Sequence, residues 1–226
     1  MFKNRKDAGR RLAARLLKYK DEQPIVLALP RGGVPVAYEV AMALNAPLDV
    51  VVVRKLGAPG QPELGIGAVV DGDHPQSVLN EEVLRFLDVS DDYLNREVAL
   101  ELQEVRRRQE IYRGGRSPER VEGRTAIVID DGIATGGSVR AALRGVRSRA
   151  PKRVILAIPV APPETVESLQ PEADELVCLR MPVFFHAVGQ FYEDFRQTTD
   201  EEVVELLEAA RQQMASTEKE RSSGNH

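Results

Sequence analysis

The sequence AIVIDDGIATGGS, residues 126–138, joins an apolar run of strand length to two adjacent acids and then to a turn of small residues. Beyond the turn, apolar residues recur at the spacing of one helix face, at Val139, Ala142, Leu143 and Val146. A helix N-terminus presents unpaired N–H groups and the positive end of the helix dipole, so it binds phosphate without a lysine or arginine. The stretch therefore predicts a buried strand, a phosphate-binding turn and a helix, in that order.

The residue types around this turn each have a use in binding a sugar phosphate. Its two glycines let the backbone approach a phosphate closely, and the hydroxyls of Thr135 and Ser138 add hydrogen-bond donors. The carboxylates of Asp130 and Asp131 suit the vicinal hydroxyls of a ribose, because they accept hydrogen bonds that a phosphate would not donate. An ordinary strand-to-helix turn would not call for two charged residues at the end of an apolar strand.

Two other kinds of phosphate-binding loop fit this stretch less well. A Walker loop needs a lysine followed by Ser or Thr after its last glycine, whereas Gly137 is followed directly by Ser138. A dinucleotide-binding fingerprint needs three spaced glycines immediately after the strand, and two aspartates occupy that place here.

The rest of the chain alternates between strand and helix patterns. Helical spacing occurs between apolar runs that are continuous, as in strands covered on both faces. This alternation predicts an α/β, Rossmann-like fold with a parallel twisted sheet flanked by helices, whose ligands bind beyond the carboxyl ends of the strands. The strand-like runs are residues 25–29, 49–53, 66–70, 125–129, 153–158 and 175–179, and the principal helical patterns are 36–44 and 139–146.

One region interrupts the alternation, and the two ends of the chain carry helices. Residues 80–113 show helical spacing without a strand signal, so we expect a helical insertion, with Ser90 capping its longer helix and Arg106 to Arg108 as a solvated helix end. Asp7 is expected to cap the first helix and Asp200 to begin the last. We expect a single domain over residues 1–214 and a disordered tail over 215–226.

Composition limits the partners. The formal net charge of −4 gives no global field to gather nucleic acid or an anionic membrane. The chain lacks the pattern of a signal peptide and has no apolar run of membrane-spanning length. A single cysteine, Cys178, excludes an intramolecular disulfide. We therefore expect a cytoplasmic protein that binds neither nucleic acid nor membranes.

At this point the sequence resembles the type I phosphoribosyltransferases. Their signature is four apolar residues, two acids, a few variable residues and a Thr/Gly-rich turn, which here are AIVI, DD, GIA and TGGS. The resemblance implies that the substrate is 5-phosphoribosyl 1-pyrophosphate and that Asp130 and Asp131 hold its ribose hydroxyls. It also implies that the 5′-phosphate is held by Ala134, Thr135, Gly136, Gly137 and Ser138.

Two further loops support the resemblance. ALPRGGVP, residues 28–35, corresponds to the loop that binds pyrophosphate, which would here use Arg31, Gly32 and Gly33. Taken alone, this loop could also be a stiffened turn with a solvated arginine.

RKLGAPGQPELGIG, residues 54–67, corresponds to the mobile catalytic loop that closes over the substrates. Arg54 and Lys55 at its base are candidate catalytic residues that would reach the departing pyrophosphate, and the alternative is a solvated pair of charges.

The resemblance implies transfer of the phosphoribosyl group to a nitrogenous base, with release of pyrophosphate. Mg²⁺ would be carried mostly by the substrate, with Asp130 or Asp131 contacting it and no dedicated metal site, and family members are often homodimers. Enzymes for 6-oxopurines usually place an aspartate where this chain has Ala134, which argues against hypoxanthine or guanine. Uracil enzymes tend to have proline at the position of Asp131, so the base is left open.

The cap over the base, or hood, is expected within residues 180–198, together with the helical insertion. Phe184 and Phe185 could stack on a planar base or close the core over the sheet edge. For His186, a packed or exposed histidine is favoured over a catalytic one. The chain also resembles bacterial and archaeal proteins known only as predicted phosphoribosyltransferases, through LPRGGVPVA, VVVRKLGAPGQPE, DDGIATGGS and FHAVGQFYEDF.

Two other functions remain open on sequence grounds. One is a regulator of the same fold that senses phosphoribosyl pyrophosphate without turning it over. The other is an enzyme that uses the same pocket to hydrolyse a phosphate ester or pyrophosphate. The acidic net charge argues against a regulator that binds DNA.

Overall fold

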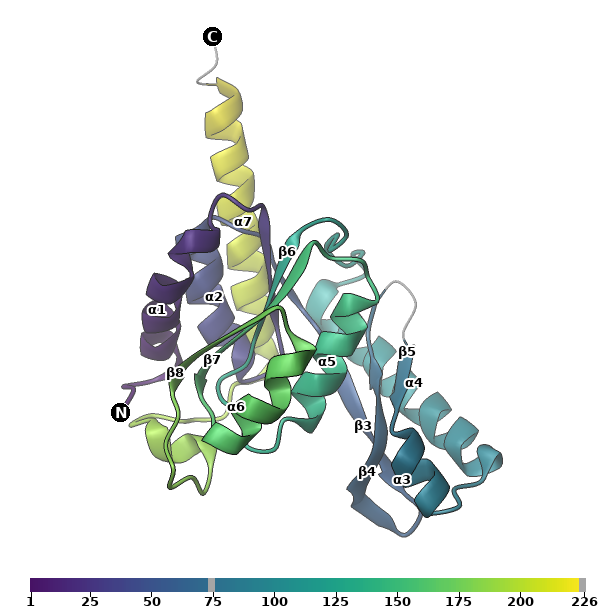
Figure 1. The fold of residues 1–226 in the computed structure, drawn as a ribbon. Helices are drawn as coiled ribbons and strands as arrows, with labels where there is room; N and C mark the ends of the chain where they lie inside the picture. The colour runs from purple at the N-terminus through teal and green to yellow at the C-terminus, as the bar shows by residue number, and fades with distance from the viewer. Residues whose placement is uncertain (73–75, 224–226) are drawn as a thin grey trace.

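The centre of the structure, a computed structural model that describes residues 1–72 and 76–223, is a sheet of five parallel strands (Figure 1). The strand order is β2-β1-β6-β7-β8. The predicted parallel α/β fold is therefore confirmed. The strands are β1 (Pro24–Ala28), β2 (Leu48–Val50), β6 (Thr125–Ile129), β7 (Arg153–Val160) and β8 (Glu175–Arg180).

Helices cover both faces of this sheet, which explains why its strands are continuously apolar. Val26 and Ile127 face one hydrophobic core, beneath α1, α2 and α7, while Leu27 and Val128 face the other, beneath α5 and α6. Both cores are shielded from water, so alternation of polar and apolar residues is lost. The helices are α1 (Arg5–Leu16), α2 (Gly33–Leu44), α5 (Gly137–Arg147), α6 (Pro163–Leu169) and α7 (Asp200–Ser223).

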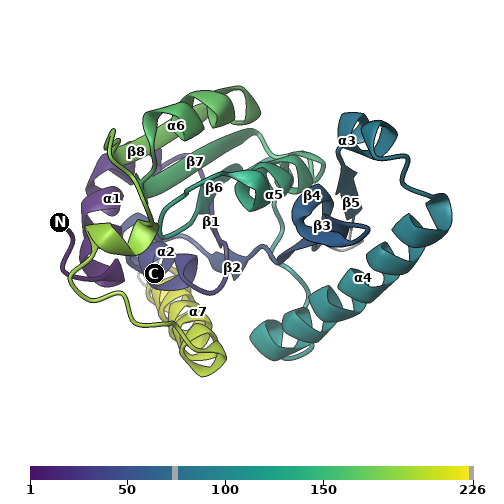
Figure 2. The same ribbon diagram turned by 90° about the horizontal axis from the view of Figure 1, so that it is seen from below.

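A second, antiparallel sheet of three strands projects from the side of the molecule with α3 and α4, and we call these elements the arm (Figure 2). Its strands are ordered β3-β4-β5. The longer helix α4 packs along β3, and α5 of the main body packs against β3 and β4. The arm consists of β3 (Val53–Ala58), β4 (Gln61–Val70), β5 (Gln76–Leu79), α3 (Glu81–Phe86) and α4 (Asp91–Arg113).

The arm corrects two predictions. The apolar run 49–53 divides between β2 and β3, and the run 66–70 belongs to the arm rather than to the parallel sheet. The predicted mobile loop 54–67 is instead a β-hairpin that turns at Pro59 and Gly60. Proline presets the first position of such a turn, and Gly60 supplies the positive φ of 69° that the second requires. A local hairpin of this kind forms more readily than a long crossover.

A buried ion cluster fixes the end of the arm to the main body. Arg113, the last residue of α4, lies with its Nε 2.9 Å from Asp49 Oδ1 and its Nη2 2.9 Å from Asp71 Oδ2. The three side chains are only 5%, 6% and 0% exposed. Burial raises the pKa of Asp71 to about 6, and the Arg113 charge opposes that rise. The arginine thus joins β2, the end of β4 and α4.

The helix ends confirm two sequence predictions and correct two. Ser90 caps α4 and Asp200 begins α7, as predicted. Asn4, however, caps α1 with its side chain, and Asp7 lies in the first turn instead. The tail predicted to be disordered from residue 215 continues α7 to Ser223, helped by hydroxyl bonds back to the preceding turn, while residues 224–226 lie outside the described part of the chain. None of the helices described here is long and apolar enough to cross a bilayer.

Replacing Arg113 with alanine should strongly destabilise the protein. Removing one partner of a buried ion cluster leaves uncompensated carboxylates and costs about 3–5 kcal/mol. The free energy of unfolding should be measured by urea denaturation near pH 8. Arg120→Ala is the matched control, because its pair with Glu122 is largely exposed and is worth less than about 1 kcal/mol. Equal losses in the two variants would contradict the role given to Arg113.

Candidate functional site

The candidate site lies where β1 and β6 end side by side. The two strands are paired in register, with Ala28 opposite Ile129, and the N–H of Leu29 bonds to the carbonyl of Ile129 over 2.8 Å. From β1 the chain continues outward to β2, whereas from β6 it continues in the other direction to β7. The strand order therefore reverses between them, which is where parallel sheets bind ligands. Both predicted phosphate-binding loops start at this edge.

The acid pair Asp130 and Asp131 directly follows β6. The backbone N–H of Asp131 donates to Asp130 Oδ1 over 2.8 Å. Asp131 is only 9% exposed, and Arg5 Nε, from the first turn of α1, donates to its Oδ2 over 2.7 Å. Its carbonyl oxygen accepts a bond of 2.5 Å from the Tyr192 hydroxyl. The pair is thus held by segments from both ends of the domain.

Burial makes the two acids hard to ionise. Desolvation raises the pKa of Asp130 well above its usual range, and the neighbouring Asp131 charge adds to the rise. Desolvation also raises the pKa of Asp131, against the opposing effect of the Arg5 guanidinium. Two crowded carboxyls gain most from a ligand that donates hydrogen bonds or carries positive charge.

The turn after the acid pair leads into a helix that no side chain caps. The N-cap of α5 is Gly136, with φ 80° and ψ 0°, and the N-cap of α2, in the other loop, is Gly32. By contrast, the side chains of Asn4, Asn80 and Ser90 cap α1, α3 and α4. The first turn of α5 therefore offers N–H groups that no side chain of the described chain accepts, whereas in α2 the N–H groups of Gly33 and Val34 already bond to the carbonyls of Leu29 and Arg31. Thr135, Gly137 and Ser138 are exposed beside the α5 turn, as is Ala134.

The loop after β1 packs directly onto the acid pair. A Cβ atom added at Gly32 would lie 2.1 Å from Asp131 Oδ2, and one added at Gly33 would lie 2.7 Å from the Ile129 carbonyl oxygen. Any side chain at either position would push the loop away from β6. Arg31, half-buried, precedes these glycines. The structure thus brings the predicted pyrophosphate loop and the predicted ribose carboxylates together.

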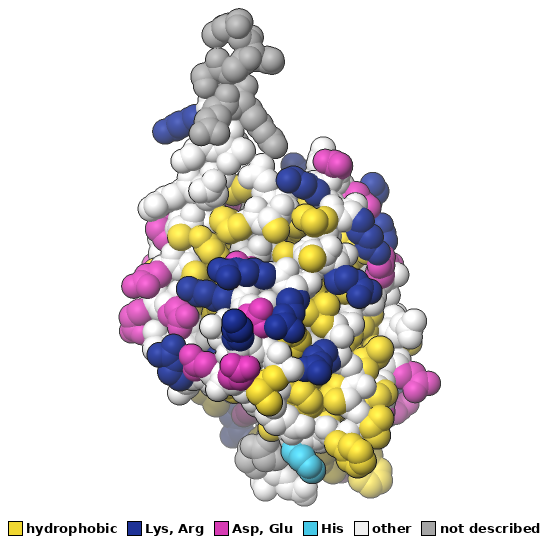
Figure 3. Space-filling model, turned by 90° about the vertical axis from the view of Figure 1, so that its left-hand side faces the viewer, with side chains coloured by type: hydrophobic (Ala, Val, Ile, Leu, Met, Phe, Trp, Pro, Cys, Tyr) yellow, Lys and Arg dark blue, Asp and Glu magenta, His cyan; other side chains and the backbone are white. Residues whose placement is uncertain are grey.

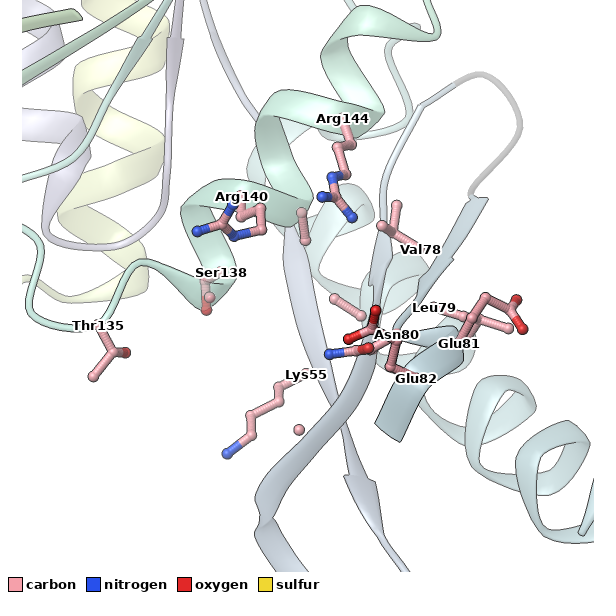
Figure 4. A pocket seen from close by; sticks show the side chains of 15 residues that line it. Lys55, Val78, Leu79, Asn80, Glu81, Glu82, Thr135, Ser138, Arg140 and Arg144 are labelled. Carbon is pink, nitrogen blue, oxygen red and sulfur yellow. The ribbon is translucent and has the colours of Figure 1, made fainter. Parts of the chain in front are cut away.

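Arg54 and Lys55 lie in β3 of the arm and have different surroundings. Arg54 Nε bonds to Glu101 Oε2 of α4 over 2.6 Å, and this bond raises the arginine pKa. Lys55 instead lines a cavity of about 740 Å³ between the arm and the first turn of α5, which Thr135 and Ser138 also line (Figure 4). Neither Arg31 nor the acid pair is among the residues that line this cavity.

The two predicted hood phenylalanines differ in exposure. Phe184 is 84% exposed, whereas the Phe185 ring packs 5.3 Å from that of Phe191. His186 is exposed, in line with the favoured interpretation. Figure 3 shows hydrophobic side chains exposed at the end of the molecule opposite the tip of α7, and the exposed apolar side chains of the described chain include Met181 and Val183.

Sequence reasoning missed Arg5 and Tyr192. Arg5 reaches Asp131 across 126 positions of the chain, and no local pattern distinguishes it from the other arginines of the basic N-terminus. Tyr192 lies within the stretch FHAVGQFYEDF, which carries part of the resemblance, but its bond to the Asp131 carbonyl depends on a tertiary contact.

Asp130→Asn should raise the thermal stability at neutral pH. Because the folded-state pKa of Asp130 is raised, ionising it opposes folding once the pH exceeds its ordinary value of 3.8. An amide avoids this cost, so Tm at pH 8 should rise by about 2–6 °C, and the gain should vanish as the pH falls toward 4.

Glu172→Gln provides a control of opposite sign. Bonds from Arg144 and Arg140 lower the pKa of Glu172, so its ionised form stabilises the fold and the substitution should lower Tm at pH 8. Differential scanning calorimetry across pH 4–8 measures both effects. A fall in Tm for Asp130→Asn at pH 8 would show that the carboxylate stabilises the fold.

Comparison with known proteins agrees with this geometry. Residues 2–196 match the model of the phosphoribosyl transferase domain. The chain is 46% identical over 215 residues to the Mycobacterium tuberculosis protein named "Putative phosphoribosyl transferase Rv0571c", covering 95% of this chain but 48% of that protein, so it spans about half the length of this relative. Its fold is similar to the crystal structure of TT1426 from Thermus thermophilus, with a TM-score of 0.82, 47% identity, and coverage of 92% of this chain and 97% of that one. The chain belongs to the phosphoribosyl transferase domain family.

Proposed function

We propose that this protein transfers the phosphoribosyl group of 5-phosphoribosyl 1-pyrophosphate to a nitrogenous base and releases pyrophosphate. Family membership supports phosphoribosyl transfer in general. The observation that carries the specific proposal is the meeting of two helix N-termini without a side-chain cap, those of α2 and α5, with an acid pair at the end of β6, of which Asp131 is buried and Asp130 half-buried. The substrate has two phosphate-bearing ends separated by a diol, and the site offers an anion-binding turn on either side of the carboxylates.

Each part of the site has a task in this reaction. The N–H groups and hydroxyls of residues 134–138 would hold the 5′-phosphate, and the acid pair would accept bonds from the ribose hydroxyls. Arg31 and the N–H group of Gly32 would hold the pyrophosphate, while the N–H of Gly33 bonds to the Leu29 carbonyl over 3.0 Å. Negative charge grows on the pyrophosphate as it leaves, so donors fixed by the fold stabilise the transition state more than the ground state.

The donor set fits a magnesium ion that arrives with the substrate. Among the described residues, no group of three or more His, Cys, Asp or Glu side chains could hold a metal by itself. Mg²⁺ favours oxygen ligands, keeps several waters, and when bound neutralises the pyrophosphate oxygens. A carboxylate of the acid pair is the protein ligand that this arrangement offers.

The acceptor base is constrained but not named by the site. Ala134 provides no general base in the phosphate turn, so a base that must lose a proton needs another acceptor. Lys55 lines the cavity on the arm side of this turn, where it would act on the departing pyrophosphate or on the base. We keep Lys55 as a candidate catalytic residue because it lines this cavity, whereas Arg54 is not among the lining residues.

One observation favours a second function, a sensor that binds phosphoribosyl pyrophosphate without turnover. Arg54, whose charge would otherwise stabilise the leaving pyrophosphate, is held within the arm by the bond of 2.6 Å from its Nε to Glu101 Oε2. The rest of the site serves binding equally well in either function.

Incubation with Mg²⁺ and phosphoribosyl pyrophosphate, with and without a panel of nucleobases, tests the reaction. We expect pyrophosphate and nucleotide to form together and only when a suitable base is present, measured by a coupled pyrophosphate assay and by chromatography of nucleotides. Tight binding without turnover across a broad panel would support the sensor instead. Release of pyrophosphate without any base would indicate hydrolysis.

Replacing both site acids tests the binding site itself. Asp130→Asn combined with Asp131→Asn should abolish binding of phosphoribosyl pyrophosphate in calorimetry, because neutral amides no longer provide the two charged acceptors. The matched control is the double variant of the adjacent acids Asp91 and Asp92, which are exposed in the first turn of α4. Unchanged affinity in the folded Asp130 and Asp131 variant would overturn the central assignment.

A further inference from the structure

Arg5 is tied more firmly than any ordinary surface arginine. Its side chain, 11% exposed, bonds through Nε to Asp131 Oδ2 at 2.7 Å and through Nη1 to the Arg196 carbonyl at 2.6 Å. Its guanidinium also lies 3.9 Å from the centre of the Phe195 ring. An arginine with two bonds and an aromatic face in contact has little freedom to leave its carboxylate partner.

The position of Asp131 relative to the loop after β1 is equally constrained. Its Oδ2 occupies the place of a side chain at Gly32, where an added Cβ would lie 2.1 Å away. Gly32 has φ −60° and ψ −32°, which suit any residue, so the contact with the carboxylate, rather than the backbone conformation, requires glycine there. The Asp131 carboxylate is therefore packed between Arg5 and the loop that starts α2.

Asp130 has different surroundings. Its Oδ1 accepts the backbone N–H of Asp131 at 2.8 Å, and within the described residues it forms no ion pair. It is partly exposed at the switch point between β1 and β6. The two neighbouring acids, alike in sequence, are thus unlike in structure, since only one of them has a fixed cationic partner.

We propose that Arg5 and Asp131 form an anchor that positions the pyrophosphate loop, residues 28–35, and that Asp130 alone contacts the ribose hydroxyls. Arg5 is in this view a positioning residue that acts through Asp131 and Gly32. The inference rests on the proposed function, because it divides between two residues a task that the function gives to both. It also explains why the Phe195 ring and the Arg196 carbonyl both contact the guanidinium that bonds to the Asp131 carboxylate.

Two probes separate contact with ribose from positioning of the loop. Inorganic pyrophosphate has no hydroxyl pair, so it reports on residues 28–35 alone, whereas phosphoribosyl pyrophosphate reports on the whole site. Dissociation constants for both, with Mg²⁺, should be measured by titration calorimetry for Asp130→Asn, Asp131→Asn, Arg5→Ala and the double variant of Arg5 and Asp131. Arg10→Ala is the matched control, because it removes another interhelix arginine–carboxylate pair of α1, with Glu39, away from the site.

The anchor predicts a distinct pattern of losses. Asp130→Asn should weaken the binding of phosphoribosyl pyrophosphate about 100-fold, while pyrophosphate should bind as tightly as before or more tightly. Asp131→Asn and Arg5→Ala should each weaken the binding of both probes by the same factor of about 10. The double variant should lose no more affinity than either single variant. Arg5→Lys should recover part of the lost affinity, since lysine keeps the positive charge but lacks the planar set of N–H donors of the guanidinium.

Gly32→Ala tests the contact between the loop and the Asp131 carboxylate without changing the chemistry of Arg5 or Asp131. Its methyl group should displace the carboxylate and reproduce the loss of affinity for both probes.

Three outcomes would overturn the inference. If Asp131→Asn weakens the binding of phosphoribosyl pyrophosphate but leaves the binding of pyrophosphate unchanged, Asp131 itself contacts the ribose. The proposed function then stands without the anchor. If the unaltered protein binds phosphoribosyl pyrophosphate but not pyrophosphate, residues 28–35 are not the loop that Arg5 positions. If it binds neither probe, the proposed function fails, and this inference fails with it.

Discussion

The backbone of Gly32 packs against the Asp131 carboxylate where β1 and β6 end. The meeting of the loop after β1 with the acid pair depends on that close contact. Gly32 and Gly33 leave room for Asp131 and for the Ile129 carbonyl, so the loop after β1 lies against the end of β6 instead of above it. The in-register pairing of Ala28 with Ile129 brings both helix N-termini to the same edge of the sheet. With a side chain at either glycine, the turns that begin α2 and α5 would separate and the acid pair would lose its cover.

The same contact has an electrostatic consequence. The carboxyls of Asp130 and Asp131 follow one another at the end of a buried strand, and desolvation raises the pKa of both. A fold selected for stability alone would not place them there, because apolar or neutral residues would cost less. The positive ends of the α2 and α5 dipoles and the Arg5 guanidinium offset part of this cost. A ligand that donates hydrogen bonds to the carboxylates would remove the rest of this desolvation cost, so the cost of burying the acids in the free protein favours binding.

Sequence patterns predicted the main sheet and the small-residue turn that begins α5 because these features are local. A continuous apolar run marks a strand covered on both faces, and a small-residue turn after it marks an uncapped helix, as residues 126–138 illustrate. The antiparallel sheet of the arm was not predicted, since the run 66–70 is as apolar as a central strand and only pairing with β3 shows that it is antiparallel. Arg5 could not be found either, because its role comes from contacts with Asp131 and Arg196 that lie far away along the chain.

Phe2, near the N-terminus, makes another contact between residues that lie far apart in the sequence. Phe2 exchanges backbone hydrogen bonds with Phe191 and Glu193, and its ring lies 5.3 Å from that of Tyr192, so the start of the domain is joined to its last loop. During synthesis Arg5 emerges early, but its partner in the loop, Arg196, is added only after the whole sheet has been made. A nascent chain therefore holds all five strands of the main sheet before it contains Phe195 and Arg196, so the contacts that fix Arg5 against Asp131 are completed only when the last loop has been made.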